Sequence, residues 1–492
     1  MTPSVGDPDD TRLDPADWSE VRRLGHELLD DLIDQLSTAG ERPAWTPVPP
    51  QVKARLEQPA ARLPTDLSDV LADLKRDILP YATGNTHPRW FGWVHGTGTA
   101  EGALGELVAA FMNCNVGGRE QAAVYVERQV VRWLADLFGF PDDSSGLLVS
   151  GTSVATILGL AVARENVGPG QVRAGGVAAV PGPLVAYASD GAHVSVRKAL
   201  ELLGLGGDAL RHVPADSVSG LDPAALEEMI KVDREAGLRP FCVVGTAGSV
   251  TTGAIDDLAA LADVCSRHGL WFHVDAAFGG ALMLSPRLSP RLAGIERADS
   301  LAFDLHKWMH VPYDAGCVLM RDAEAHRATF SADRNYLSRF ERGTGSGDPW
   351  FTDFGPELSR GFRALKVWVT LRTHGLDRLG DMVEKNCEQA SWLASRIKES
   401  ESFHLAAPTS LNIVCFQAEV PGGARIDSDE LNREIVMRVQ ERGIAVPSTA
   451  EIDGRLCIRV NITNHRTRRE DLEIFLVAIE ETRREIVHEA IA

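Results

Sequence analysis

The chain of 492 residues is 44% hydrophobic and 24% charged, a composition typical of soluble globular proteins. Asp and Glu outnumber Lys and Arg by 69 to 50, and the net charge of −19 argues against nucleic acid as a partner, because phosphate binding needs a basic surface. No apolar run reaches the length of a membrane span, and the polar, acidic N-terminus differs from a signal peptide. The seven cysteines are widely spaced and form no C-x-x-C pair, so we expect free thiols in a cytoplasmic protein without a membrane partner.

The first predicted elements are helical. Residues 17–38 carry apolar side chains at helical spacing and predict an amphipathic helix. A proline-rich connector follows at roughly 42–64, and a second helical stretch covers 66–79. We therefore expect residues 1–100 to form an N-terminal helical segment.

From about residue 100 to 340, short apolar runs alternate with helical stretches. Several of these runs are almost wholly apolar, as expected for strands that crossover helices bury on both faces. The runs are LLVS (147–150), LVAYAS (184–189), FCVVGT (241–246), LWFHVD (270–275), SLAFD (300–304) and CVLM (317–320). The pattern predicts a large α/β domain with a mainly parallel sheet, assigned to residues 101–375.

The C-terminal part changes pattern. A polar, glycine-containing stretch at 331–350 predicts a mobile loop, and a long helix is expected at 359–397. The tail then alternates strands and helices: LNIVCFQ (411–417), a helix at 428–442, RLCIRVNI (455–462) and a helix at 467–487. This order predicts a small α+β domain over residues 376–492.

Polar side chains follow five of the predicted strands, and ligands of open α/β sheets bind at the carboxyl ends of strands. After the first strand, Gly151 and two hydroxyl residues open a helix whose free N–H groups favour an anion such as phosphate. The polar residues that follow the five strands are, in chain order, Thr152 with Ser153, His193, Thr246, Asp275, and Asp304 with His306 and Lys307.

Each of these features alone has an ordinary structural explanation. Hydroxyl residues at a helix start are usually caps, and a lysine at a strand end is usually a surface residue. Together, however, they supply a phosphate cradle, a flat ring, a hydroxyl, a carboxylate and an amine. Pyridoxal 5′-phosphate needs all of these, since its aldehyde takes a lysine, its pyridine nitrogen an Asp, and its phosphate a helix start.

The chain resembles the group II pyridoxal-phosphate amino-acid decarboxylases, the family of aromatic amino acid and glutamate decarboxylases. The matching pieces extend over nearly everything from about residue 17 to 485. They are HPRWFG (87–92), SGTS (150–153), DGAHVSVRKAL (190–200), GTAGSVTTGAID (245–256), HVDAAFGG (273–280), DLHKW (304–308) and ELSRGFRALKVW (357–368). The resemblance implies the aspartate-aminotransferase fold, an obligate homodimer, and conversion of an L-amino acid to an amine and carbon dioxide.

The resemblance also implies roles for single residues. Lys307 matches the lysine that forms a Schiff base with the cofactor, and Asp275 matches the partner of the pyridine nitrogen. His193 matches the imidazole stacked on the ring, with Ala277 on the opposite face and Thr246 near the ring. Phosphate-side positions match Thr152, Ser153 and His306.

Two stretches depart from the family pattern. The phosphate cradle has Thr152 and Thr156 where the family often has a second Gly and an Asn. The segment 117–128, GGREQAAVYVER, differs from the SPA-type stretch of animal aromatic decarboxylases and lies near the substrate in the family.

Substrate identity is left open between two classes. Trp90, Phe91 and Trp93 follow His87 in a segment that lines the substrate side in the family. Their aromatic surface suits an indole or phenol ring better than a distal carboxylate, which would require an Arg or Lys. Core or dimer-interface packing explains the same residues equally well. We expect tryptophan, tyrosine, phenylalanine or DOPA as substrate, with an aliphatic or acidic amino acid as the alternative.

Tyr336 lies in the polar stretch at 331–350, where the family has a tyrosine that closes over the site and protonates the substrate carbon after carbon dioxide leaves. Relatives with phenylalanine at this position tend to make an aldehyde, ammonia and peroxide. The tyrosine therefore favours simple decarboxylation over aldehyde synthesis.

Other classes of protein explain less of the sequence. HGTGTAEG (95–102) and SGTSVA (150–155) imitate the His and Ser blocks of subtilisin-like proteases, but an upstream Asp block is missing. GTGTAEG also places its third glycine one residue too late for the dinucleotide-binding motif. His306 and His310 are four residues apart without a third ligand nearby, so no metal site is predicted.

Overall fold

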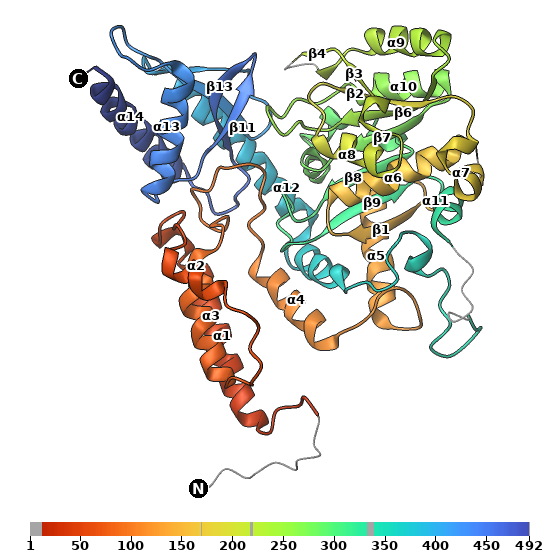
Figure 1. Ribbon diagram of the computed structural model, residues 1–492, viewed down its shortest axis with the longest axis horizontal. Helices are drawn as coiled ribbons and strands as arrows, with labels where there is room; N and C mark the ends of the chain where they lie inside the picture. Colours follow the sequence, from red (N-terminus) through yellow and green to blue (C-terminus); the bar gives the residue numbers. More distant parts are fainter. Residues whose placement is uncertain (1–11, 169, 217–219, 332–338, 492) are drawn as a thin grey trace.

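The computed structural model describes residues 12–168, 170–216, 220–331 and 339–491. The N-terminal helices form an arm that projects from the rest of the molecule, with the large α/β domain and the small C-terminal domain beyond it (Figure 1). The arm contains α1 (Trp18–Ser37), α2 (Pro50–Leu56) and α3 (Leu67–Asp77). The sequence predicted only a connector around α2, but Pro50 stands at the first helical turn, where its missing N–H costs no hydrogen bond.

The large domain is built on a seven-stranded sheet in the order β1-β9-β8-β7-β6-β2-β3. All of its strands run parallel except β9, which is antiparallel to both of its neighbours. The mainly parallel sheet predicted from the apolar runs is therefore confirmed. The strands are β1 (Ser145–Val149), β2 (Leu184–Ser189), β3 (Leu210–Val213), β6 (Arg239–Thr246), β7 (Trp271–Asp275), β8 (Ser300–Asp304) and β9 (Gly316–Met320). A separate pair, β4 (Ala215–Asp216) and β5 (Gly220–Leu221), forms a two-stranded ribbon.

Helices surround this sheet and bury it, so that β2, β7, β8 and β9 are buried along their whole length. This burial is why these strands are so apolar in sequence. The helices of the domain are α4 (Ala100–Met112), α5 (Ala122–Leu137), α6 (Thr152–Asn166), α7 (Gln171–Gly175), α8 (Val194–Leu202), α9 (Pro223–Glu235), α10 (Leu258–His268) and α11 (Ala323–Phe330).

The small domain has its own hydrophobic core and follows the long helix α12 (Arg363–Lys398), which links it to the large domain (Figure 1). Gly375 interrupts α12 with non-helical angles, φ 71° and ψ 160°, at the position where the sequence placed a domain boundary. An antiparallel sheet in the order β10-β11-β13-β12 packs against two helices. Its elements are β10 (Phe403–Leu405), β11 (Ile413–Ala418), α13 (Ser428–Glu441), β12 (Ser448–Ile452), β13 (Arg455–Asn461) and α14 (Arg469–Ile491).

Candidate active site

The carboxyl ends of the parallel strands bring the predicted site residues to one edge of the sheet. Thr246 at the end of β6 lies beside Asp275 at the end of β7, and Asp275 lies beside Ala302 of β8. The turn after β7 is held to β8 by the Asp304 N–H, which donates to the Ala277 carbonyl at 3.3 Å. Residues far apart in sequence, from Thr246 to Asp304, thereby share one short edge, as the parallel topology predicts.

Lys307 is held by an ion pair with the end of its own strand. Its Nζ lies 2.9 Å from Oδ2 of Asp304, whose side chain is almost completely buried. The other carboxylate oxygen, Oδ1, accepts a hydrogen bond from the backbone N–H of Thr152 at 2.7 Å. Asp304 therefore fixes the lysine and ties the end of β8 to the start of α6. The sequence noted Asp304 only as a strand end, although an acid three residues before the lysine is the signal for this role.

Asp275 is a buried carboxylate with little compensation from the protein. Burial raises its pKa, whereas the hydrogen bond that the Ala277 N–H donates to Oδ1 at 3.0 Å, and the nearby Lys307 and His193, oppose that rise. A carboxylate in this position gains from a cationic partner. A protonated pyridine nitrogen would supply one.

His193 presents a neutral flat ring at the start of α8. Its Nδ1 accepts the N–H of Ser195 at 3.2 Å and lies 2.8 Å from the Ser195 hydroxyl, so the proton of the neutral ring resides on Nε2. Burial lowers the pKa of His193, and the positive charge of Lys307 acts in the same direction. A neutral imidazole fixed at this angle can stack on an aromatic ring.

The phosphate side is a cavity of about 330 Å³ at the start of α6. The hydroxyl of Thr152 faces no hydrogen-bond partner among the described residues, although it is buried. His306 is fixed in this region because its Nδ1 accepts the N–H of Ala315 at 3.1 Å, and burial lowers its pKa. The cavity walls include Thr152, Ser153, His193, Ala277, His306 and Lys307.

A second cavity of about 300 Å³ adjoins the first and shares His193, Ala277 and Lys307 with it. Thr246 and Asp275 line this second cavity as well. An orphaned hydroxyl at a helix start, a buried acid, a flat neutral ring and an amine thus line two adjoining cavities. This donor set fits pyridoxal 5′-phosphate.

The comparisons with known proteins agree with this geometry. Residues 49–419 match the family model of the pyridoxal-dependent decarboxylase conserved domain. The chain belongs to the pyridoxal-dependent decarboxylase family. It is 31% identical over 473 residues to an aromatic-L-amino-acid decarboxylase of Bacillus atrophaeus, covering 95% of this chain and 96% of the relative.

Solved structures of the family are also similar to this decarboxylase. The crystal structure of Oryza sativa TDC with PLP and tryptamine matches with a TM-score of 0.87 and 26% identity, covering 97% of this chain and 100% of that one. Rhodiola rosea 4-hydroxyphenylacetaldehyde synthase matches with a TM-score of 0.85 and 26% identity, covering 96% and 100%. The expected fold, cofactor and reaction class are confirmed, and the serine-protease alternative is ruled out.

Only one of the four substrate-side residues expected from the sequence lines the cavity, and that residue is Trp93. Phe91 is fully buried and packs on Phe475 of α14, with ring centroids 5.4 Å apart, in the core of the small domain. Trp90 is buried against Ala44 and Val446. Neither side chain lines the cavity, and the segment is held in place by its pairing with Val446, whose carbonyl accepts the Phe91 N–H at 2.8 Å.

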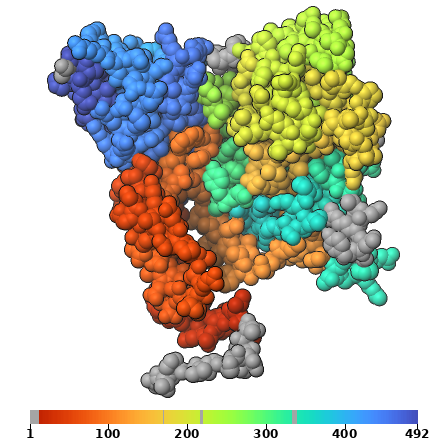
Figure 2. All heavy atoms as spheres, in the orientation of Figure 1, coloured from red at the N-terminus to blue at the C-terminus, as the bar shows by residue number. Residues whose placement is uncertain are grey.

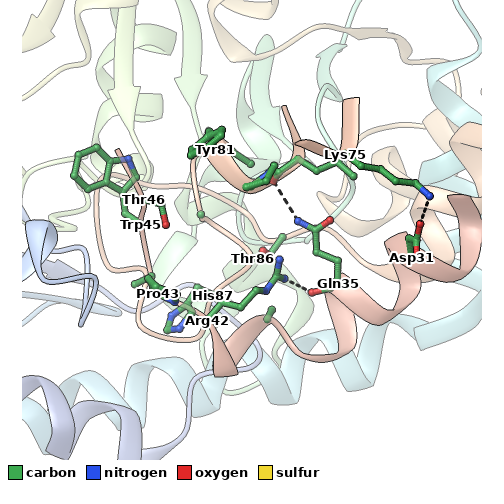
Figure 3. Close-up of a pocket in the computed structure, with 16 residues that line it drawn as sticks. Asp31, Gln35, Arg42, Pro43, Trp45, Thr46, Lys75, Tyr81, Thr86 and His87 are labelled. Atoms are coloured by element: carbon green, nitrogen blue, oxygen red, sulfur yellow. Dashed lines mark hydrogen bonds and ion pairs between the residues drawn. The ribbon is translucent and has the colours of Figure 1, made fainter. Parts of the chain in front are cut away.

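His87 is likewise buried outside the cofactor cavity. It lines a separate cavity of about 560 Å³ between the N-terminal arm and the segment that leads to the large domain. Figure 3 shows His87 there beside Arg42 and Pro43, with Trp45 and Tyr81 on the other side of the space. His87, Trp90 and Phe91 are thus packed outside the lining of the cofactor cavity, and their contact with the substrate stays a prediction.

The cavity lining includes residues that were not predicted as site residues, among them His95 and Tyr313. His95 entered the sequence analysis only through the protease comparison, and Tyr313 carried no sequence signal because it lies in an irregular segment after the lysine. The Tyr313 ring packs on His306 with centroids 4.2 Å apart, and burial raises its pKa to about 12.

Tyr336 lies outside the described residues. Within the described parts of the chain, no group of three or more His, Cys, Asp or Glu side chains could hold a metal ion. A search of the same residues for a helix long and apolar enough to cross a membrane also found none.

Proposed function

We propose that this decarboxylase acts on an aromatic L-amino acid and releases the corresponding amine. The observation that carries the proposal is the lining of the cavity beyond Lys307, where Trp93, His95, Phe278 and Tyr313 supply aromatic rings. Lys307 is the only Lys or Arg among the described residues that line this cavity, and it is reserved for the cofactor. A substrate with a distal carboxylate would lack a cationic partner there, whereas a flat apolar ring would be well accommodated.

The residues around the cavity would have distinct roles in binding the cofactor and the substrate. Lys307 would hold the cofactor aldehyde until the substrate amine displaces it, and Asp275 would keep the pyridine nitrogen protonated. His193 and Ala277 would hold the two faces of the ring and Thr246 its substituents. Thr152, Ser153 and His306 would bind the phosphate. When bound, pyridoxal phosphate accepts the electrons that remain when carbon dioxide leaves the substrate.

A homodimer in the cytoplasm completes the proposal. One face of α4 carries exposed apolar side chains, and such a face is costly to leave in water. The N-terminal arm projects from the body of the molecule on the side where α4 lies (Figures 1 and 2). The exposed residues are Leu104, Leu107, Val108, Phe111 and Met112. A second copy of the chain would bury them if it packed on α4 and contacted the N-terminal arm. The absence of disulfides among the described cysteines is compatible with a reducing compartment.

The dimer is tested by Phe111→Asp, with Val477→Asp on α14 as a control at another exposed apolar residue. Light scattering after size-exclusion chromatography should give a dimer for wild type and the control, and a monomer for Phe111→Asp. A monomeric wild type would contradict the proposal.

Tyr336 remains part of the proposal as the group that returns a proton to the substrate carbon. Tyr336→Phe should lower amine formation and raise oxygen-dependent peroxide, measured in the same reaction. An unchanged ratio of the two products would assign the proton to another group, with His193 the next candidate.

The substrate proposal is tested by measuring amine and carbon dioxide release across a panel of amino acids. Tryptophan, tyrosine, phenylalanine and DOPA should be the best substrates. Histidine belongs in the panel because the human histidine decarboxylase is 30% identical over 469 residues. Activity on glutamate alone would overturn the aromatic assignment.

A further inference from the structure

His95 stands at the substrate end of the cavity within a group of aromatic rings. The Trp90 ring stacks on it at a centroid distance of 5.7 Å and an interplanar angle of 11°, and the Trp93 ring lies at 5.7 Å and 27°. Tyr313 meets it edge-on at 6.2 Å. The imidazole plane is therefore fixed from more than one side before any ligand arrives.

The ring nitrogens of His95 have no hydrogen-bond or ion-pair partner within the described parts of the chain, although the neighbouring backbone is well anchored. The Thr463 hydroxyl donates to the main-chain carbonyl of His95 at 3.0 Å, and this bond does not involve the imidazole ring. His95 is partly buried and lines the same space as Lys307. Its two nitrogens are therefore available to a ligand in this cavity.

The protonation state of His95 limits what it can recognise. Burial lowers its pKa, and the neighbouring Lys307 and His306 lower it further, so the ring is neutral near pH 7. A neutral imidazole offers one donor and one acceptor but no charge. It suits a neutral polar group, such as a phenol hydroxyl or an indole N–H, better than a carboxylate.

We propose that His95 determines specificity by hydrogen-bonding a polar group on the aromatic ring of the substrate. This inference rests on the proposed function and adds a preference within it: hydroxylated or N–H-bearing rings over an unsubstituted phenyl ring. Tyrosine and phenylalanine differ by one hydroxyl and are the most direct pair for comparison. With one neutral hydrogen bond, the tyrosine preference that depends on His95 should be about tenfold in kcat/KM.

The test compares His95→Phe with wild type on tyrosine and phenylalanine. Phenylalanine at position 95 keeps a flat ring between its neighbours but removes both nitrogens. The ratio of kcat/KM for tyrosine to that for phenylalanine should fall about tenfold, because only tyrosine loses a hydrogen bond. His95→Gln, which retains a donor and an acceptor, should recover part of the ratio.

Trp90→Phe is the matched control, because Trp90 stacks on His95 but lies outside the cavity lining. A purely structural effect on the wall should lower both substrates alike and leave the ratio unchanged. If His95→Phe also left the ratio unchanged, the specificity role would be refuted.

A binding measurement separates recognition from chemistry. Tyrosine methyl ester and phenylalanine methyl ester lack the free carboxylate, and their dissociation constants are measured from the absorbance change of the holoenzyme. His95→Phe should weaken the tyrosine ester selectively and leave the absorbance of the resting holoenzyme unaltered. Wild-type enzyme that decarboxylates none of the four aromatic amino acids of the panel would refute the proposed function. Activity on aromatic amino acids without a tyrosine preference that depends on His95 would refute only the role of His95.

Discussion

The active site has two walls that are built in different ways. The cofactor wall consists of His193, Thr246, Asp275, Ala277 and Lys307, which stand at or just beyond the ends of four strands of one buried sheet. The substrate wall consists of Trp93, His95 and Tyr313, which lie in segments without regular structure. The cofactor wall therefore takes its geometry from sheet hydrogen bonds, and the substrate wall takes its geometry from contacts with other parts of the chain.

Those contacts reach across to the small domain. The Trp93 carbonyl accepts a hydrogen bond from Nη1 of Arg459 at 2.9 Å, and the His95 carbonyl accepts one from the Thr463 hydroxyl at 3.0 Å. Arg459 also donates to the Thr251 carbonyl at 3.2 Å, and so connects the small domain to the loop after β6. The position of the substrate wall thus depends on how the small domain sits, while the cofactor wall belongs to the large domain alone.

The largest expected effect comes from a change in the cofactor wall that lowers the rate of decarboxylation. Asp275→Asn should still bind pyridoxal phosphate, because the phosphate side and Lys307 are untouched. Decarboxylation should nevertheless fall by several orders of magnitude, since an amide cannot hold the pyridine nitrogen protonated. Cofactor content from absorbance and single-turnover rates measure the two properties separately. A near-normal rate in this variant would mean that Asp275 is not the partner of the nitrogen.

A pair of variants tests which side chains of the segment after His87 belong to the substrate wall. Phe91→Ala should destabilise the protein by about 3–5 kcal/mol, because it opens a hole in the small-domain core. Trp93→Ala should cost much less stability, since Trp93 is half exposed, and should instead raise KM for an aromatic substrate. Denaturant unfolding and steady-state kinetics check both. Equal effects of the two variants on KM would contradict this division.

The contrast between the walls also sets what the sequence could predict. The strand ends could be read from apolar runs, and each cofactor-wall residue stands at the end of its strand or follows it by at most a few positions, so Asp275 and Lys307 lie at the sheet edge where the sequence placed them. The substrate wall could not be read in this way. Trp90, Phe91 and Trp93 are all large aromatic residues within one short segment. Only the pairing of this segment with Val446 decides which of them is buried. Tyr313 reaches the cavity through tertiary packing that no local pattern encodes.

The pH dependence of stability should distinguish the walls in the cofactor-free protein. Because burial raises the folded-state pKa of Asp275, the unfolded chain ionises first as pH rises, and wild type loses stability between the unfolded and folded pKa values. Above the folded pKa the loss is constant. Asp275→Asn should therefore gain stability relative to wild type as pH rises from 4 towards 7. The free energy of unfolding of Trp93→Phe should differ from that of wild type by an amount that does not depend on pH. If the free energy of unfolding of Asp275→Asn also ran parallel to that of wild type across this pH range, burial would not raise the pKa of Asp275.

The smallest expected effect concerns the hydrogen bond that connects the substrate wall to Thr463 of the small domain. Thr463→Val removes the hydroxyl that donates to the His95 carbonyl but preserves the shape of a buried side chain. Losing one hydrogen bond of about 1 kcal/mol should let the His95 segment shift and raise KM for an aromatic substrate several-fold. The cofactor absorbance should remain that of wild type, because no cofactor-wall residue contacts Thr463 among the described hydrogen bonds.

Thr482→Val is the matched control, since Thr482 is a buried threonine of the same domain that accepts from Arg442 and lies away from the cavity. If both variants raised KM equally, the effect would come from general loosening of the small domain; if only Thr463→Val does so, the small domain positions the substrate wall through this bond.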